Sequence, residues 1–126
     1  MRNAPLMIAS AALLLAQAAP VAAHPKLLAA RPAANAISAS PPKRIELRFS
    51  EGLISRFAGA DLFIKDSGPK ARAPIKLAST TTVAADGHTL IVTPAAQLRP
   101  GVYNLAWRVV SVDTHRVTGN HPFTIR

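Results

Sequence analysis

Two side chains near the C-terminus, Asp113 and His115, are of types that bind metal ions, and they stand two residues apart. Strand-like sequence lies on both sides of them, and in an extended strand residues i and i+2 project from the same face. The spacing therefore predicts a carboxylate and an imidazole side by side on one strand face. Such a pair supplies half of a metal site, and His24, far away in the sequence, is a candidate for the other half.

The residues before His24 predict that it gains a second metal-binding group. Residues 1–23 combine a basic start, a short apolar run and the small residues Val21-Ala22-Ala23, a pattern typical of a cleaved secretory signal peptide. The apolar run is shorter than the roughly 20 residues of a membrane-spanning helix, although an uncleaved anchor is the alternative. Cleavage after Ala23 would leave residues 24–126 as one soluble exported domain that begins with the free amine of His24.

The available donor atoms favour oxidised copper. The chain contains no cysteine, so a metal site must use nitrogen and oxygen ligands. The amine and imidazole of His24, the imidazole of His115 and the carboxylate of Asp113 would provide three nitrogens and one oxygen. A tetragonal set of this kind favours Cu(II), which also leads the affinity order of the divalent metals, whereas zinc would fit less well. Without a metal, His24 is a frayed terminus and the other two residues are a surface pair.

Alternating apolar and polar residues predict the strands that would position these groups. Such patterns occupy the ranges 43–50, 60–65, 80–84, 89–93, 102–110 and 118–126, with a weaker one at 74–77. Asp86-Gly87 predicts a hairpin turn, and further turns are expected at 66–69 and 99–101. The Ala-, Pro- and Ser-rich range 29–42 reads as an extended lead-in. About seven strands and no helix predict an all-β sandwich or Greek-key barrel.

The remaining sequence features argue against catalysis and nucleic-acid binding. The chain lacks a Gly-x-Ser-x-Gly elbow, a phosphate-binding glycine loop, a His-Glu-x-x-His motif and an EF-hand loop. Its net charge is +9, but the basic residues are spread singly, and one Trp, one Tyr and four Phe offer no base-stacking platform. We therefore expect a basic, solvated surface on a protein that is not an enzyme.

Several segments together resemble the CopC family of small periplasmic copper-binding proteins. They are His24-Pro25-Lys26-Leu27, the range 45–51, Gly101-Val102-Tyr103, and Trp107-Arg108-Val109-Val110-Ser111-Val112-Asp113-Thr114-His115 with the following Thr118-Gly119. The resemblance spans nearly all of residues 24–126. It implies an immunoglobulin-like Greek-key β-barrel and one Cu(II) per chain, bound by His24, Asp113 and His115. It also makes Glu51 a candidate weak ligand or hydrogen-bond acceptor for a ligand, the alternative being an exposed loop acid.

One departure from the family pattern concerns reduced copper. Some members carry a methionine-rich loop that binds Cu(I), but the range 66–78 here has neither Met nor His, and Met1 and Met7 belong to the predicted signal peptide. Since thioethers select Cu(I), we expect a Cu(II)-only protein. His88 is expected to be a solvated turn residue. His121 is a minor candidate, because Thr118-Gly119 is expected to interrupt strand pairing.

The leading functional hypothesis is a periplasmic, monomeric Cu(II)-binding protein of copper resistance or homeostasis that sequesters or delivers the ion. Expected partners are copper itself and an inner-membrane copper importer or another periplasmic copper protein. A second hypothesis is a small copper oxidoreductase that uses an N-terminal histidine brace, although Asp113 would fill a position that oxygen chemistry needs open. A third is an exported immunoglobulin-like interaction module without a metal.

Overall fold

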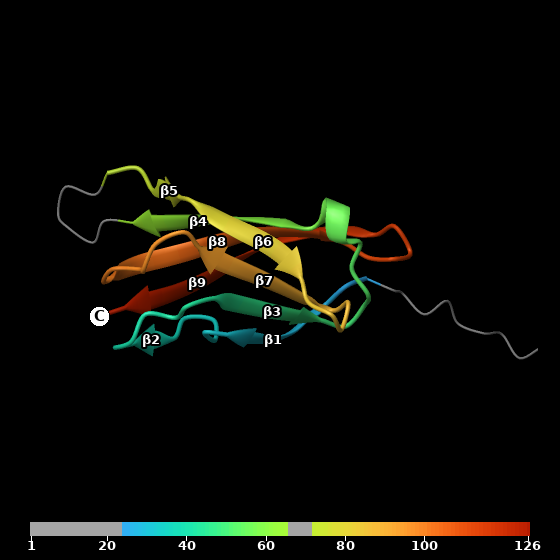
Figure 1. Cartoon of the computed structure of the whole chain (residues 1–126), viewed down its shortest axis with the longest axis horizontal. Helices are drawn as coiled ribbons and strands as arrows, with labels where there is room; N and C mark the ends of the chain where they lie inside the picture. The colour runs from blue at the N-terminus through green and yellow to red at the C-terminus, as the bar shows by residue number, and fades with distance from the viewer. Residues whose placement is uncertain (1–23, 66–71) are drawn as a thin grey trace, which may run out of the picture.

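Two β-sheets pack face to face in the computed structural model, which describes residues 24–65 and 72–126 (Figure 1). One sheet has the strand order β1-β3-β7-β6 and the other the order β2-β9-β8-β4-β5. All paired neighbours run antiparallel except β2 and β9, which are parallel. The elements are β1 (Leu27–Arg31), β2 (Ile37–Ser38), β3 (Ile45–Phe49), the 3-10 turn η1 (Ser55–Phe57), β4 (Gly59–Lys65), β5 (Ile75–Leu77), β6 (Ser79–Val83), β7 (Thr89–Pro94), β8 (Gly101–Val110) and β9 (Arg116–Ile125).

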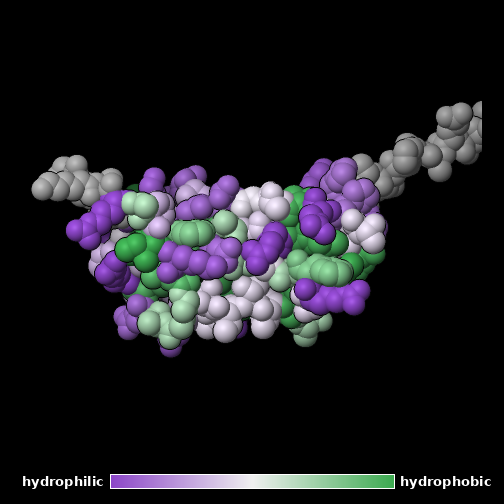
Figure 2. Space-filling view, turned by 90° about the horizontal axis from the view of Figure 1, so that it is seen from above, coloured by the Kyte–Doolittle hydropathy of each residue, from purple (hydrophilic) through white to green (hydrophobic). Residues whose placement is uncertain are grey.

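The core lies between the sheets and is built mainly from alternate residues of β3, β4, β7, β8 and β9. Ile45, Leu47 and Phe49 of β3 are almost fully buried, as the period-two pattern predicts. Tyr103, Leu105, Trp107 and Val109 face them from β8. Phe49 meets the Trp107 indole edge to face with ring centroids 5.0 Å apart. On the outer surface seen in Figure 2, hydrophilic and hydrophobic residues are interspersed.

The all-β prediction is confirmed, with nine strands in the described residues instead of about seven. The two additional strands, β1 and β2, lie in the range expected to be a lead-in. Most residues of β1 are exposed, and β2 has only two residues, so neither shows the alternation that marks a half-buried strand. The weakly predicted strand at 74–77 exists as β5. The predicted signal peptide and the predicted turn at 66–69 lie outside the described residues.

Different segments of the chain meet at the two ends of the sandwich (Figure 1). Segments 24–26, 50–57, 84–89 and 111–116 meet at one end, here called the site end. Main-chain hydrogen bonds join three of these segments, from Leu53 N to Gly87 O at 2.8 Å and from Val112 N to Gly52 O at 2.9 Å. The opposite end, called the far end, carries the C-terminal tips of β4 and β9 and the starts of β5 and β8. No helix within the described residues is long and apolar enough to cross a membrane.

Candidate metal centre

Asp113 and His115 lie in the turn between β8 and β9, so the prediction that they share a strand face is wrong. The turn closes through a bond from Thr114 N to Ser111 O at 2.8 Å and another from Ser111 N to His115 O at 2.9 Å. Thr114 has a φ of 72°, which reverses the chain direction. The sequence pattern did not predict this turn because residues 111–115 contain neither Gly nor Pro. Asp113, a residue type favoured in turns, was the available signal.

The turn nevertheless places the two predicted ligands in contact. The distance from His115 Nδ1 to Asp113 Oδ2 is 3.0 Å, and both side chains are partly exposed. The hydroxyl of Ser111 donates a hydrogen bond to the other carboxylate oxygen, Asp113 Oδ1. Because Ser111 is fully buried, this hydrogen bond anchors the Asp113 carboxylate to the interior of the sandwich. This hydroxyl first, and His115 second, hold the pKa of the Asp113 carboxyl below its ordinary value.

His24 reaches the same place from the other end of the sequence. Its ring meets that of His115 edge to face, with centroids 4.6 Å apart. The chain behind it is anchored, because Pro25 is buried and Lys26 is tied to Ser50 by two hydrogen bonds. These bonds run from Lys26 N to Ser50 Oγ at 2.9 Å and from Ser50 N to Lys26 O at 2.8 Å. His24 therefore lies directly before a segment that is anchored to the sandwich.

The predicted ligands are assembled but do not surround a common point. Within residues 24–65 and 72–126, no three His, Asp or Glu side chains are arranged so that they could hold an ion as they stand. The Asp113 carboxylate faces Nδ1 of His115, and the His24 ring packs edge to face against the His115 ring. The donor chemistry fits Cu(II), since nitrogen and oxygen atoms are within reach. The contact between His115 Nδ1 and Asp113 Oδ2 leaves Nε2 of the His115 ring uninvolved.

Comparison with known proteins assigns the chain to a family. The CopC domain model matches residues 27–126. This protein belongs to the CopC family. Copper resistance protein C of Xanthomonas campestris pv. juglandis is 42% identical over 104 residues, which cover 82% of this chain and 81% of that protein. Copper resistance protein C of Pseudomonas syringae pv. tomato is 38% identical over 104 residues, with 82% of both chains covered.

A solved structure of the family also has this fold. The crystal structure of PcoC from Escherichia coli, a methionine-rich copper resistance protein, superposes with a TM-score of 0.74 at 38% identity. The match covers 82% of this chain and all of the PcoC chain. The similarity confirms the β-sandwich, with which an immunoglobulin-like fold is consistent. Unlike PcoC, this CopC chain is not rich in methionine, because its only methionines are Met1 and Met7.

Of the other predicted candidates of this CopC chain, Glu51 and His88 lie at the site end, whereas His121 is buried in the core. Glu51 is half-buried in the loop after β3, at the site end, and takes part in none of the ion pairs found within the described residues. His88 is also at the site end, in the β6–β7 hairpin. Its carbonyl accepts a bond from Phe49 N at 2.9 Å, and its amide N–H donates to Asp86 Oδ1 at 2.9 Å.

His121 is a core residue, and the predicted break before it is absent. β8 and β9 pair without interruption from Val110 opposite Arg116 to Gly101 opposite Ile125. His121 is only 1% exposed, and its Nε2 lies 2.7 Å from the carbonyl oxygen of Pro32. Six residues of extended strand separate it from His115, which corresponds to about 20 Å. Its role is therefore to fill the core and to hold the chain between β1 and β2.

Proposed function

We propose that the mature protein is a periplasmic copper-binding protein that takes up one Cu(II) at the site end. The amine and ring of His24, the ring of His115 and the carboxylate of Asp113 would bind the ion. The observation that carries this proposal is the contact between the His24 and His115 rings, in which residues 91 positions apart meet beside a carboxylate. The similarity to two proteins named copper resistance protein C supports the choice of metal.

The proposed role is sequestration or delivery of copper in resistance or homeostasis, without catalysis. The site comprises an exposed turn and the exposed His24, so an ion bound there would be accessible to another protein. A membrane copper importer or a second periplasmic copper protein is the proposed recipient. Because Asp113 would occupy a coordination position, it would fill a position that the oxygen activation of a histidine-brace oxidoreductase needs open.

Extension of the mature chain by one residue tests the proposed ligand set. A chain that begins at His24 should bind one equivalent of Cu(II), with the paramagnetic resonance spectrum of a nitrogen- and oxygen-ligated tetragonal site. A single glycine added before His24 keeps the imidazole but moves the amine away, so affinity should fall by about 100-fold or more. Equal affinity of the two proteins would contradict the terminal-amine ligand.

The test of the side-chain ligands uses two histidines of the same end. Loss of a ligand should cost more than the 10–100-fold that changes to the residues supporting a ligand typically cost. His115→Ala should therefore reduce Cu(II) affinity by more than about 100-fold, whereas His88→Ala should leave it unchanged. If the unaltered chain that begins at His24 binds no copper, the metal-free interaction module is favoured. Turnover of a substrate with peroxide or a reductant would favour the oxidoreductase.

A further inference from the structure

A hollow lies on the outer face of the sheet β1-β3-β7-β6, next to the edge strand β1. It has a volume of about 360 Å³ and is bordered by Ala29, Ala30, Arg31, Glu46, Arg48 and Thr89. The pairing of β1 with β3 explains its shape, because Arg48 lies opposite Ala29, whose small side chain leaves the space beside the arginine open. Arg31 lies opposite Glu46, so the two arginines occupy diagonal positions on one face of the ladder.

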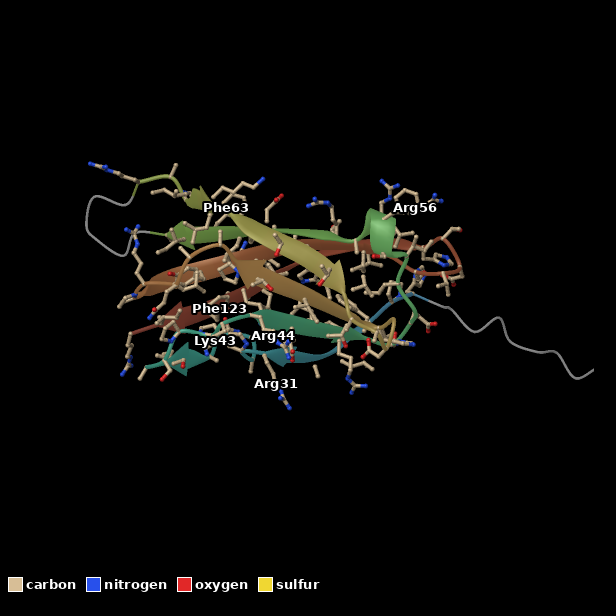
Figure 3. All side chains as sticks on the ribbon, in the orientation of Figure 1. Arg31, Lys43, Arg44, Arg56, Phe63 and Phe123 are labelled. Atoms are coloured by element: carbon tan, nitrogen blue, oxygen red, sulfur yellow. The ribbon has the colours of Figure 1, made fainter. Side chains whose placement is uncertain are left out.

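The arginines of the hollow point away from the interior of the sandwich. Ala30 and Leu47, which alternate with them along β1 and β3, pack into or against the core. In Figure 3, Arg31 extends from β1 away from the sheets, whereas Arg56 is at the site end on η1. All four strands of this sheet lie within the described residues, and none of the proposed copper ligands borders the hollow.

Positive charge exceeds negative charge on this outer face. Its charged residues are Arg31 on β1 and, along β3, Arg44, Glu46 and Arg48, whereas β6 and β7 contain no charged residue. Arg44 Nη2 lies 2.8 Å from Glu46 Oε1, so the carboxylate of the face already has a cationic partner. The ion pairs found within the described residues include neither Arg31 nor Arg48. The hollow therefore has two arginines that no described acid neutralises.

The other acids of the chain belong to other places in the fold. Asp86 lies in the β6–β7 hairpin, where its carboxylate accepts two main-chain N–H bonds and one hydroxyl bond from its own turn. Asp61 is paired with cations of the other sheet, and Glu51 and Asp113 lie at the site end. Asp66 is outside the described residues and follows β4, a strand of the other sheet. An anion in the hollow would thus meet two unpaired guanidinium groups and one carboxylate that is already paired.

The backbone that carries the two arginines is ordered before a ligand arrives. β3 is a central strand that pairs with β1 on one side and with β7 on the other. Leu47, between Glu46 and Arg48, is fully buried, and Ala30 fixes the position of the main chain before Arg31. Such prior order lowers the entropy cost of binding.

We propose that the hollow between Arg31 and Arg48 binds a phosphate-bearing anion. Diagonal neighbours of an antiparallel ladder stand roughly 7–8 Å apart, which leaves room for one phosphate group between their guanidinium groups. Each planar guanidinium binds a pair of phosphate oxygens, and the tetrahedral oxygens of phosphate can serve both arginines, whereas a carboxylate has oxygens for only one. The phosphate can belong to a free phosphate ion or to the headgroup of an anionic lipid. In the second case the outer face of this sheet would lie on the membrane surface.

Three variants of the predicted mature chain, which contains both sheets, test the proposal. Arg31→Gln/Arg48→Gln removes the two charges of the hollow. Arg56→Gln/Arg126→Gln removes two exposed charges elsewhere and is the matched control. Ala29→Gln keeps the charge but fills the hollow, and the sandwich should tolerate it because Ala29 is exposed on an edge strand.

Each protein is studied without metal. It is titrated with inorganic phosphate at constant ionic strength, followed by amide chemical shifts, and is sedimented with vesicles of phosphatidylglycerol or of phosphatidylcholine. Circular dichroism checks that each variant is folded. Chemical-shift changes at residues 29–31 and 46–48 with inorganic phosphate would identify free phosphate as a ligand. Sedimentation with phosphatidylglycerol, without a response to inorganic phosphate, would identify the lipid headgroup.

Arg31→Gln/Arg48→Gln should weaken binding by about fivefold for each charge removed, and the control pair should weaken it much less. Ala29→Gln should also weaken binding, because its longer side chain occupies the place of the phosphate. Three results would overturn the proposal, namely no binding of either probe by the unaltered chain, equal losses in the two arginine variants, or unchanged binding by Ala29→Gln. The second and third would indicate an effect of net charge only. The proposal does not depend on copper binding and can fail or succeed independently of it.

Discussion

At the scale of single residues, the candidate metal centre depends on a serine that carries no metal-binding group. Ser111 is fully buried, yet its hydroxyl reaches the carboxylate of Asp113, and its backbone N–H holds the carbonyl of His115. It therefore connects both proposed turn ligands to the core. Residues of this kind orient ligands and tune their affinity without touching the metal.

Replacement of Ser111 should weaken copper binding without abolishing it. Ser111→Ala removes the bond that orients the Asp113 carboxylate, so Cu(II) affinity should fall by about 10- to 100-fold. The free energy of unfolding should fall by about 1 kcal/mol, the usual net value of one hydrogen bond. Copper titration and urea unfolding measure the two effects.

A neighbouring hydroxyl provides the control for this serine. Thr114 Oγ1 bonds to the main-chain carbonyl of Asp113 and does not contact its carboxylate. Thr114→Ala should therefore leave the Cu(II) affinity within about threefold of the unaltered chain. If Ser111→Ala and Thr114→Ala had the same small effect, the orienting role of Ser111 would be excluded.

At the scale of elements, the β8–β9 hairpin carries the turn with the proposed ligands Asp113 and His115. Its ladder joins ten residue pairs, from Gly101 with Ile125 to Val110 with Arg116. Gly119 lies opposite Trp107, and a Cβ at Gly119 would collide with the indole ring. The close approach that Gly119 permits lets the indole cover β9 and stay in the core, so this glycine serves packing and does not break the strand.

Substitution of this glycine should destabilise the sandwich. Gly119→Ala forces the buried Trp107 to move, and overpacking of this kind costs about 1–3 kcal/mol. Gly59→Ala is the matched control in the same sheet, because its Cβ would meet only the end of the Arg108 side chain, which can swing into solvent. Urea unfolding followed by Trp107 fluorescence should show a clear loss for Gly119→Ala and less than about 1 kcal/mol for Gly59→Ala. Equal midpoints for the two variants would contradict the packing role.

At the scale of the whole molecule, carboxylates with lowered pKa connect stability to pH. The pKa of Asp61 lies below its ordinary 3.8 because Lys76 donates a hydrogen bond to it, and the Thr89 hydroxyl does the same for Asp86. The Ser111 hydroxyl lowers the pKa of Asp113 in the same way. In each case the unfolded chain binds the proton at a higher pH than the folded chain does. Their stabilising effect is therefore present above pH 3.8 and is lost as the pH falls through the lower folded values.

Thermal unfolding should reveal this acid sensitivity. The contribution of these three carboxyls to the melting temperature should stay constant between pH 7 and 5, and the melting temperature should fall progressively once the pH drops below about 4. Asp86→Asn removes one titrating group, so the drop between pH 4 and 2.5 should be smaller in that variant. A melting temperature that stays constant down to pH 2.5 would contradict the assignment.

The alternation of residues determined most of the sandwich. Strands β3, β4 and β6 to β9 were predictable because each buries one face and exposes the other, and the Asp86-Gly87 pair marked a hairpin. The types of His24, Asp113 and His115, together with the absence of cysteine, determined the chemistry of the candidate site. The predicted cleavage that would free the amine of His24 is likewise a property of the sequence alone.

Tertiary structure decided how those residues are held. That Asp113 and His115 stand in a turn depends on main-chain bonds across β8 and β9 and on the left-handed Thr114, which no local period encodes. The burial of His121 depends on the unbroken ladder that Gly119 allows. The contact of His24 with His115 arises only when strands far apart in the chain pair. Periodicity reports which face of a strand is buried, whereas the closure of the sandwich decides which ends meet.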